Sequence, residues 1–421
     1  MALPTSPTLS GLMRSVCGKK QPHPSRRELS DDYGALEVGG RPLAPGTGTM
    51  MALARRWRSA AAAAAVSVGV TLDAARALGS DAPGPAAARG VQDVRPPGPT
   101  YVLYAADGSP ARASDVARHA LRAADVLLVG EAHGDPGAHR FEADVFAELR
   151  SRAPRADPAR PLVLSLEMFE RDVQPVVDEY LSGLTREVDL VRDGRAWPNY
   201  ARDYRALVEG AREGGVPVLA ANAPRRLVGL VSREGPGALA RLPRASRGHL
   251  APLPAPAPSA ALAAKVQAEL AGAAAQIAAA RGGAAGQPGC PAGFTASADF
   301  LAAQGLWDAT MAHSIAGALG RGPGGALVVH LCGRFHCEEG LGIPEHLARY
   351  APRARVLTAV VRPAPGGRLA LTQDEFRELR LGRFGDFVCL TEGHVVPPPP
   401  PPPAGGARPA AAGGAAGEAR A

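Results

Sequence analysis

Two short turns with the spacing Gly-x-x-His carry the side chains best suited to chemistry. They are GEAH at 130–133 and GRFH at 333–336. Imidazole and carboxylate groups are ligands for zinc, manganese or iron, and a site drawn from separate parts of a chain can leave a position open for water or substrate. A spare carboxylate beside a metal-bound water can act as a general base. The two turns therefore indicate a binding site or a hydrolytic site.

Each turn follows an apolar run rich in Val and Leu. Such runs, without strict alternation, are typical of strands buried on both faces. Helical patterns separate them, and Asp135 with Pro136 forms a good start for the helix after the first run. The sequence therefore predicts an α/β fold with a mainly parallel central sheet flanked by helices. The five predicted strands are VLLVG (126–130), LVLSLE (162–167), VPVLAAN (216–222), ALVVHLCG (326–333) and RVLTAVV (355–361).

Polar side chains stand at the carboxyl ends of four of these predicted strands. In parallel sheets, ligands bind outside the carboxyl ends, so these side chains are expected to face one crevice. Two residues apart on an extended backbone, Glu131 and His133 can point to the same side. One polar residue after a strand would mean little, but four such ends together favour a real site. The polar residues at these strand ends are Glu131, His133, Glu167, Asn222, Arg334 and His336.

The stretch QGLWDATMAHSIA (304–316) predicts a further helix near this site. Met311 recurs at helical spacing with other apolar residues, so we expect it in the core rather than as an axial ligand. Asp308 and His313 are weaker candidates for a wall of the site.

These residues and their neighbours resemble the ChaN family, whose members bind haem and include iron-regulated bacterial lipoproteins with relatives in chloroplasts. Tiki proteases and erythromycin esterases belong to the same larger set. The resemblance runs in the family's order over about 120–350 and implies an α/β domain with a smaller helical subdomain at about 225–300. The stretches that carry this resemblance are GEAH, SLEMFE (165–170), VLAANAPRRLVGLVSREG (218–235), QGLWDATMAHSIA and VVHLCGRFHCEEGLGIPEHL (328–347).

The resemblance implies first a protein that holds or transfers haem or another tetrapyrrole without transforming it. In haem-binding relatives a tyrosine ligates the iron with help from a histidine, and haems can be held between two subunits, so a homodimer is an expected partner. Tyr200 and Tyr204 in WPNYARDY are the tyrosines to test, although helix packing is the more common role for either. Arg225 and Arg226 can pair with propionates or form a solvated helix start. The expected cofactor-binding set is His133, His336, Tyr200, Tyr204, Arg225 and Asn222.

The hydrolytic relatives imply an alternative, a metal-dependent esterase or protease. Its divalent ion (zinc, manganese or iron) would be held by Glu131, His133, Glu167 and His336, and Glu131 and Glu167 would be its catalytic carboxylates. A third alternative is a scaffold or a peripheral, membrane-associated regulator that keeps the fold without the chemistry. We favour a binding protein over a hydrolase.

The chain departs from the family's pattern beside the first turn. The family has a second histidine where Ala138 stands and a glutamine where Glu142 stands, which weakens any role assigned to His139.

Composition excludes some partners. Aromatic residues make up only 5% of the 421 residues, which argues against a base-stacking platform, and we expect no nucleic-acid partner. The net charge of +7 belongs mostly to residues 1–99, with 12 Lys and Arg against 7 Asp and Glu, while residues 100–421 hold 35 against 33. The cysteines form no C-x-x-C pair, and Cys332 and Cys337 are expected to be buried apolar residues.

Residues 54–82 have the order of an export signal. Arg55 and Arg56 precede the apolar stretch 60–70, which is too short to span a bilayer, and Ala-Arg-Ala at 75–77 fits a cleavage site. With some fifty residues before it, the segment predicts a transit peptide followed by a twin-arginine-like signal, leading to the chloroplast and its thylakoid lumen. The alternatives are a disordered Ala-rich extension, or a start at Met50 or Met51 that leaves a simple signal for export.

Three segments follow from these patterns. Residues 1–95 are expected to be a targeting extension and 96–396 a single ChaN-like domain. Within that domain, the proline-rich stretch 251–258 precedes a predicted helix and the loop RGGAAGQPGCPAG. Residues 397–421, which begin with an unbroken proline run, are expected to be a disordered tail.

Overall fold

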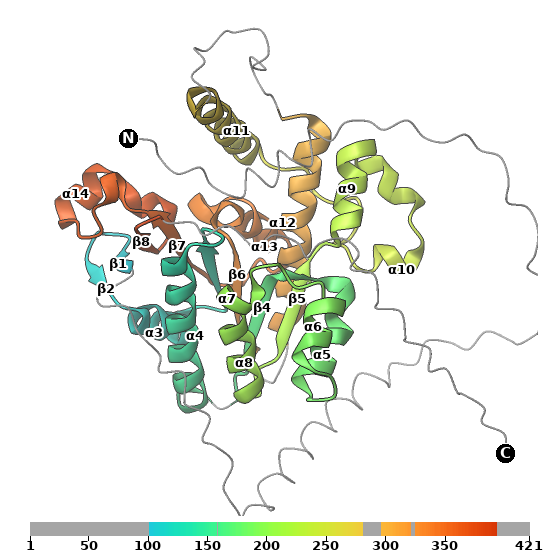
Figure 1. Ribbon diagram of the computed structural model, residues 1–421, viewed down its shortest axis with the longest axis horizontal. Helices are drawn as coiled ribbons and strands as arrows, with labels where there is room; N and C mark the ends of the chain where they lie inside the picture. The colour runs from blue at the N-terminus through green and yellow to red at the C-terminus, as the bar shows by residue number, and fades with distance from the viewer. Residues whose placement is uncertain (1–100, 158, 281–295, 321–324, 394–421) are drawn as a thin grey trace, which may run out of the picture. The chain divides into compact units, whose positions relative to one another are not determined.

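The computed structural model describes residues 101–157, 159–280, 296–320 and 325–393 (Figure 1). The targeting extension at 1–95, the loop that follows the helical insertion, and the tail at 397–421 lie outside these described residues.

An eight-stranded, mostly parallel sheet forms the centre of the fold, which confirms the predicted class. Its strand order is β2-β1-β8-β7-β3-β6-β4-β5, and the antiparallel pairs are β1 with β2 and β1 with β8. All five predicted strands are present as β3 to β7, whereas β1, β2 and β8 were not predicted. The bounds are β1 Tyr101–Ala105, β2 Pro110–Ala111, β3 Val126–Glu131, β4 Leu162–Glu170, β5 Val218–Asn222, β6 Leu327–Gly333, β7 Val356–Pro363 and β8 Phe387–Thr391.

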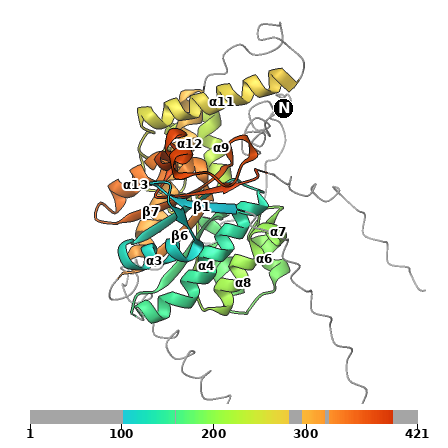
Figure 2. The ribbon, with the colours of Figure 1, turned by 90° about the vertical axis from the view of Figure 1, so that its left-hand side faces the viewer.

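Helices cover both faces of the sheet, as the fully buried parallel strands require. One face packs against α3 (Ala113–Ala123), α4 (Pro136–Ala156), α5 (Gln174–Leu181) and α8 (Arg205–Glu213). The other packs against α12 (Ala298–Leu319), α13 (Ile343–Tyr350) and α14 (Gln373–Glu378). Figure 2 shows α4 and α8 on one side of the strands and α13 on the other.

The helix α4 begins where the sequence predicts. The carboxylate of Asp135 accepts a hydrogen bond from the backbone N–H of Gly137 at 2.8 Å, and Pro136 occupies the first helical position. This cap fixes the direction of the chain immediately after the first Gly-x-x-His turn. The short helices α6 (Glu187–Asp193) and α7 (Tyr200–Asp203) lie between α5 and α8 in the chain.

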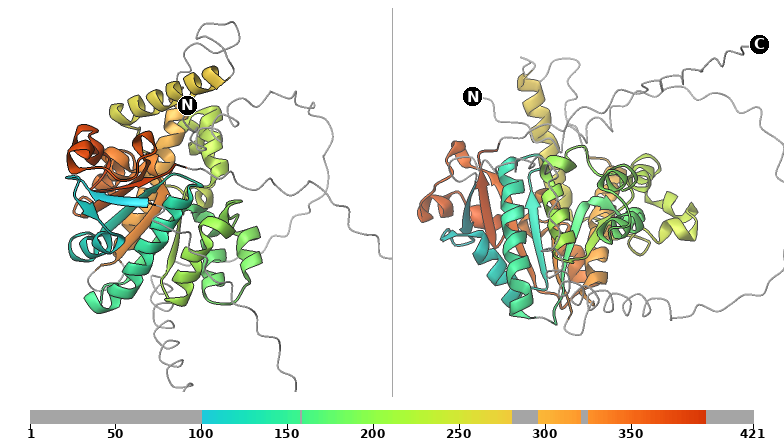
Figure 3. Two further views of the ribbon diagram at one scale, coloured as in Figure 1. Left: turned by 60° about the vertical axis from the view of Figure 1, so that its left-hand side comes forward. Right: turned by 60° about the horizontal axis from the view of Figure 1, so that its bottom comes forward.

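A group of helices lies beyond the carboxyl ends of the strands. It contains α9 (Arg225–Glu234), α10 (Arg244–Arg247) and α11 (Ala260–Ala280), together with the first part of α12. Leu262, Val266 and Leu270 of α11 pack with Phe335 and Leu341, so α11 lies over the second Gly-x-x-His turn. Figure 3 shows α11 in yellow at one end of the domain. Of these helices, α9, α10 and α11 lie within the range 225–300, and a separate helical subdomain there stays a prediction.

Several predictions for single residues concern the core. Met311 is fully buried in the core between α12 and the sheet, as its spacing predicted. Cys332, Cys337 and Cys389 are buried free thiols, and burial raises the pKa of Cys389 well above its usual range. Within the described residues, no helix has both the length and the apolar character needed to cross a membrane.

Candidate functional site

The two Gly-x-x-His turns begin side by side. Strands β3 and β6 are parallel neighbours, and Glu131 is in register with Gly333. Both strands end at the same edge of the sheet, so GEAH and GRFH leave it together. The crevice predicted at the carboxyl ends of the strands is formed around this pair.

The glycine of each turn makes room for the other turn. A Cβ on Gly130 would lie 2.8 Å from Cα of Arg334 and 2.6 Å from Sγ of Cys337. A Cβ on Gly333 would lie 2.8 Å from Nε2 of His133. Real Cβ contacts are not this short, so a side chain at 130 would push against the backbone of the second turn and one at 333 would displace the imidazole of His133. The glycines are required by close approach between the turns.

Glu131 is the buried centre of the first half of the site. Its Oε1 accepts a hydrogen bond of 2.5 Å from the hydroxyl of Tyr204 and contacts Nδ1 of His133. Burial alone would raise the pKa of Glu131, but the charges of His139 and His133 outweigh burial and lower it. The carboxylate therefore stays ionised and holds both neighbours in place.

His133 is oriented by Glu131 on one side and by Trp197 on another. The rings of His133 and Trp197 meet edge to face with centroids 4.9 Å apart. Because Nδ1 is engaged by Glu131, Nε2 is the nitrogen left for a ligand. Burial alone would lower the pKa of His133, but the negative charge of Glu131 has the larger effect, so the pKa of His133 is raised.

The second half of the site is built on His336. Its Nδ1 lies 2.5 Å from Oδ1 of Asp308, which α12 brings to the sheet, and its Nε2 lies 3.8 Å from Oε1 of Glu167. The other oxygen of Glu167 accepts a 2.7 Å hydrogen bond from the backbone N–H of Gly333. Burial lowers the pKa of His336, but Asp308 and Glu167 outweigh it and raise the pKa to about 9.

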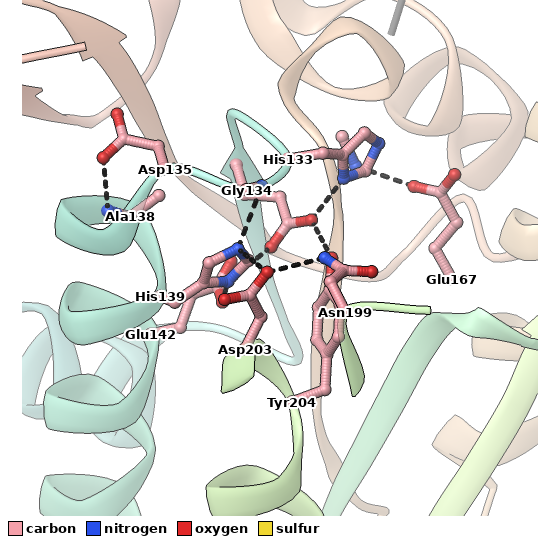
Figure 4. Close-up of polar contacts among 12 residues, drawn as sticks. His133, Gly134, Asp135, Ala138, His139, Glu142, Glu167, Asn199, Asp203 and Tyr204 are labelled. Carbon is pink, nitrogen blue, oxygen red and sulfur yellow. Dashed lines mark hydrogen bonds and ion pairs between the residues drawn. The ribbon is translucent and has the colours of Figure 1, made fainter. Parts of the chain in front are cut away.

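Behind Glu131 lies a second polar layer that includes His139 (Figure 4). Nδ1 of His139 lies 3.0 Å from Oε2 of Glu142 and 3.3 Å from Oε2 of Glu131. Its Nε2 lies 3.3 Å from Oδ2 of Asp203 and accepts a 3.1 Å hydrogen bond from the backbone N–H of Gly134. Burial and the nearby charge of Glu131 raise the pKa of Glu142 well above its usual range.

A small pocket separates the two halves of the site. It has a volume of about 10 Å³, the room needed by a single water molecule. A large flat ligand does not fit inside this pocket, and His133 is the more exposed of the two turn histidines. The lining residues are Glu131, Leu166, Glu167, Met168, Trp197, Tyr204, Leu331 and Cys332.

The structure brings together Glu131, His133, Glu167, His336 and Tyr204 of the residues named from the sequence. The phenol of Tyr204 is buried and donates to Glu131, and burial raises its pKa well above the usual range, so the hydroxyl stays protonated.

The remaining sequence candidates lie elsewhere. The Tyr200 ring is buried, and its hydroxyl has no hydrogen-bond partner among the described residues. Asn222 ends β5, where its side chain accepts from the N–H of Ala223. Arg225 is exposed at the start of α9. His313 contacts Arg171, not the two turns.

Sequence reasoning missed several members of the site. Asp308 was given only a place in the wall, yet it is the hydrogen-bond partner of His336. His139 and Glu142 carried a signal, since they stand three residues apart on one helix face. For Trp197 and Asp203 the only signal was their closeness in the chain to Tyr204.

The family model described as "Haem-binding uptake, Tiki superfamily, ChaN" matches residues 117–347, more than half of the chain. A solved structure described as cofacial heme binding to ChaN of Campylobacter jejuni is similar at 15% sequence identity with a TM-score of 0.48. That similarity covers 70% of this chain and 97% of the other. A comparison with curated proteins gives no match.

Proposed function

We propose, on the premise that this chain belongs to the ChaN family of haem-binding uptake proteins in the Tiki superfamily, that it binds haem or another metalloporphyrin at the crevice between its two Gly-x-x-His turns. It would hold or hand over the tetrapyrrole without transforming it.

One observation carries this proposal: Nδ1 of His133 contacts the buried carboxylate of Glu131, which leaves Nε2 for an axial bond to iron. Haem iron is commonly held by a histidine whose other ring nitrogen donates to a carboxylate or carbonyl, which fixes the ring and raises its basicity. The contact between Nδ1 of His133 and Glu131 supplies that carboxylate and leaves Nε2 available. Burial and a raised pKa count against Tyr204 as an alternative ligand.

The size of the pocket supports a ligand that lies across the mouth of the crevice. A pocket of about 10 Å³ holds no part of a macrocycle, while binding sites normally bury most of their ligand's surface. A second copy of the chain facing the first would cover the other face of the porphyrin. We therefore propose a homodimer in the loaded state.

Titration of the purified full chain with haemin tests the proposal. We expect a shifted Soret band that saturates, and a loss of that band or at least a tenfold weaker affinity in His133→Ala. His119→Ala, on the exposed part of α3, is the matched control and should bind as the parent does. A Soret titration identical in His133→Ala and the parent would rule out His133 as the ligand.

Metal-dependent hydrolysis is the second candidate, favoured by the second half of the site. Asp308 supports His336, and Nε2 of His336 faces Glu167 across 3.8 Å, which suits a small ion or a water between them. Esterase or peptidase activity that needs a divalent ion and disappears in His336→Ala, in a protein without a Soret shift, would favour this candidate.

We also propose delivery to the chloroplast and its thylakoid lumen. The support is the order of Arg55, Arg56, the apolar stretch 60–70 and the small residues at 75–77. Residues 1–95 fused to a fluorescent protein should enter chloroplasts, and Arg55→Lys with Arg56→Lys should stop passage into the lumen. Export of the protein from a translation start at Met50 or Met51 would contradict this proposed chloroplast location.

A further inference from the structure

A buried trio of side chains lies behind the crevice and shares only Glu131 with the haem site proposed above. His139 and Glu142 stand one turn apart on α4 (Figure 4), and Glu131 reaches them from the end of β3. One ligand-type atom from each residue lies within 4.8 Å of the other two. In the part of the chain that the structure describes, this is the one group of His, Cys, Asp or Glu with such spacing.

The distances within the trio are those of ligands around one ion. Nδ1 of His139 lies 3.3 Å from Oε2 of Glu131 and 3.0 Å from Oε2 of Glu142. Two ligand atoms bonded at about 2.1 Å to the same ion are about 3.0 Å apart at an octahedral angle and about 3.4 Å apart at a tetrahedral one. The side chains therefore need little movement to bind an ion.

Two oxygens of the trio make no hydrogen bond, although one of them, Oε2 of Glu131, forms an ion pair with His139. Oε2 of Glu131 and Oε1 of Glu142 make no hydrogen bond, although the two residues are only 3% and 1% exposed. A buried carboxylate oxygen without a partner is costly, and native proteins normally satisfy such atoms. A cation between the two carboxylates would satisfy both oxygens.

The surroundings of His139 fit a ligand histidine. Its second nitrogen, Nε2, lies 3.3 Å from Oδ2 of Asp203. Asp203 is itself held by a 2.6 Å hydrogen bond from Asn199 and by Arg202. When Nδ1 binds an ion, the proton of the neutral ring is on Nε2, which then donates to Asp203 and no longer accepts from the N–H of Gly134. A carboxylate in this position fixes the tautomer and orientation of a metal-bound histidine.

We propose that Glu131, His139 and Glu142 bind one divalent first-row transition ion, with Asp203 as the outer carboxylate of His139. Two carboxylates and an imidazole suit Zn²⁺, Mn²⁺ or Fe²⁺. The ion holds Glu131 through Oε2, while Oε1 keeps its contacts with Tyr204 and His133. It therefore fixes the crevice from behind without entering it.

Co²⁺ is a suitable probe because its visible absorption reports coordination. The full chain is stripped with a chelator and titrated with Co²⁺, and the metal content of the untreated protein is measured by mass spectrometry. We expect one equivalent per chain in the parent. Glu142→Gln should weaken binding at least a hundredfold, and Asp203→Asn by about ten- to a hundredfold.

Three controls distinguish loss of this site from general unfolding and from an ion bound in the crevice. Glu142→Gln keeps the shape of the side chain, and its amide can donate to Oε2 of Glu131, so circular dichroism should show an unchanged fold. Glu148→Gln, on a partly exposed position of the same helix, should bind Co²⁺ as the parent does. His336→Ala should also bind it, because His336 is not a member of the trio.

Two outcomes would overturn the proposal. If Co²⁺ binding survives in Glu142→Gln and is lost in His336→Ala, the ion lies in the crevice. If the stripped parent binds no Co²⁺ and the untreated protein holds no metal, a proton shared between the two carboxyl groups satisfies the unpartnered oxygens instead. Neither outcome depends on the haem titration, so the two proposals succeed or fail separately.

Discussion

Nε2 of His133 lies 2.8 Å from the position that a Cβ atom of residue 333 would occupy. His133 belongs to the first Gly-x-x-His turn and Gly333 begins the second, so the imidazole of one turn packs against the bare backbone of the other. The absence of a side chain at 333 is thus part of the way His133 is positioned.

Gly333→Ala should therefore displace His133. A methyl group in this packed position costs about 1–3 kcal/mol of unfolding free energy, and haem affinity should fall because Nε2 moves. Gly317→Ala on α12 is the matched control, because a Cβ there meets nothing within 4 Å and alanine favours a helix. Urea unfolding and haemin titration of both variants check this; unchanged stability and affinity in Gly333→Ala would contradict the geometry.

The two tyrosines named from the sequence should respond differently to loss of the hydroxyl. Tyr204 donates to the ionised Glu131, so Tyr204→Phe should cost about 1.5–3 kcal/mol of stability. Tyr200 has a buried hydroxyl without a partner among the described residues, so Tyr200→Phe should be neutral or stabilising. If His133 is the iron ligand, both variants keep a Soret band, and its loss in Tyr204→Phe alone would instead favour a tyrosinate ligand.

The carboxylate of Glu338 should be the most costly charge to remove near the second turn. It is 1% exposed and pairs with Arg334 at 2.9 Å, Arg362 at 2.8 Å and Lys265 at 3.2 Å. Glu338→Gln leaves three cations without their counter-charge and should lower the unfolding free energy by about 3 kcal/mol.

The adjacent Glu339→Gln is the control for that measurement. Glu339 pairs with Arg383 at the surface, and such pairs contribute about 1 kcal/mol or less. Thermal unfolding of both variants measures this difference. Equal losses of stability in Glu338→Gln and Glu339→Gln would show that burial does not strengthen the ion pairs of Glu338.

His330 should make the fold sensitive to acid. Burial in β6 lowers its pKa to about 3, and Ser165 lies 2.8 Å from its Nδ1. Because the folded pKa lies below the unfolded value, the stabilisation is complete above about pH 6.5 and is lost as the pH falls toward 3. Between pH 6.5 and pH 5 this amounts to about 2 kcal/mol.

Urea unfolding at these two pH values measures that effect. The parent should lose about 2 kcal/mol more than His330→Asn, whose amide can keep the contact with Ser165. Other titrating groups are shared by both proteins and largely cancel in the difference. Equal losses would show that His330 is not the group responsible.

The parallel strands could be predicted because their residues are buried on both faces. Runs such as VLLVG and LVLSLE are largely apolar on both faces and are therefore expected in the interior, and each forms a strand. In contrast, β1 and β8 are five residues long, and they pair with each other from opposite ends of the domain. Nothing local in YVLYA specifies a partner so distant in the chain.

The site was predictable only as far as strand ends could define it. Glu131 ends β3 and Glu167 lies in the last part of β4, while His133 and His336 come shortly after β3 and β6, so the sheet places the four together. Asp308 depends on how α12 packs across β6, which a sequence does not state. The exposed edge of the crevice is likewise formed by Trp197, from a loop without periodicity.

The pairing of β3 with β6 has a consequence for the order of events in the cell. During synthesis, GEAH emerges early, but GRFH appears only after β4, β5 and the helices α4 to α12 have been made. Because each turn occupies the space left by the other's glycine, neither has its final shape alone. A nascent chain therefore cannot complete the crevice until the ribosome has passed the second turn.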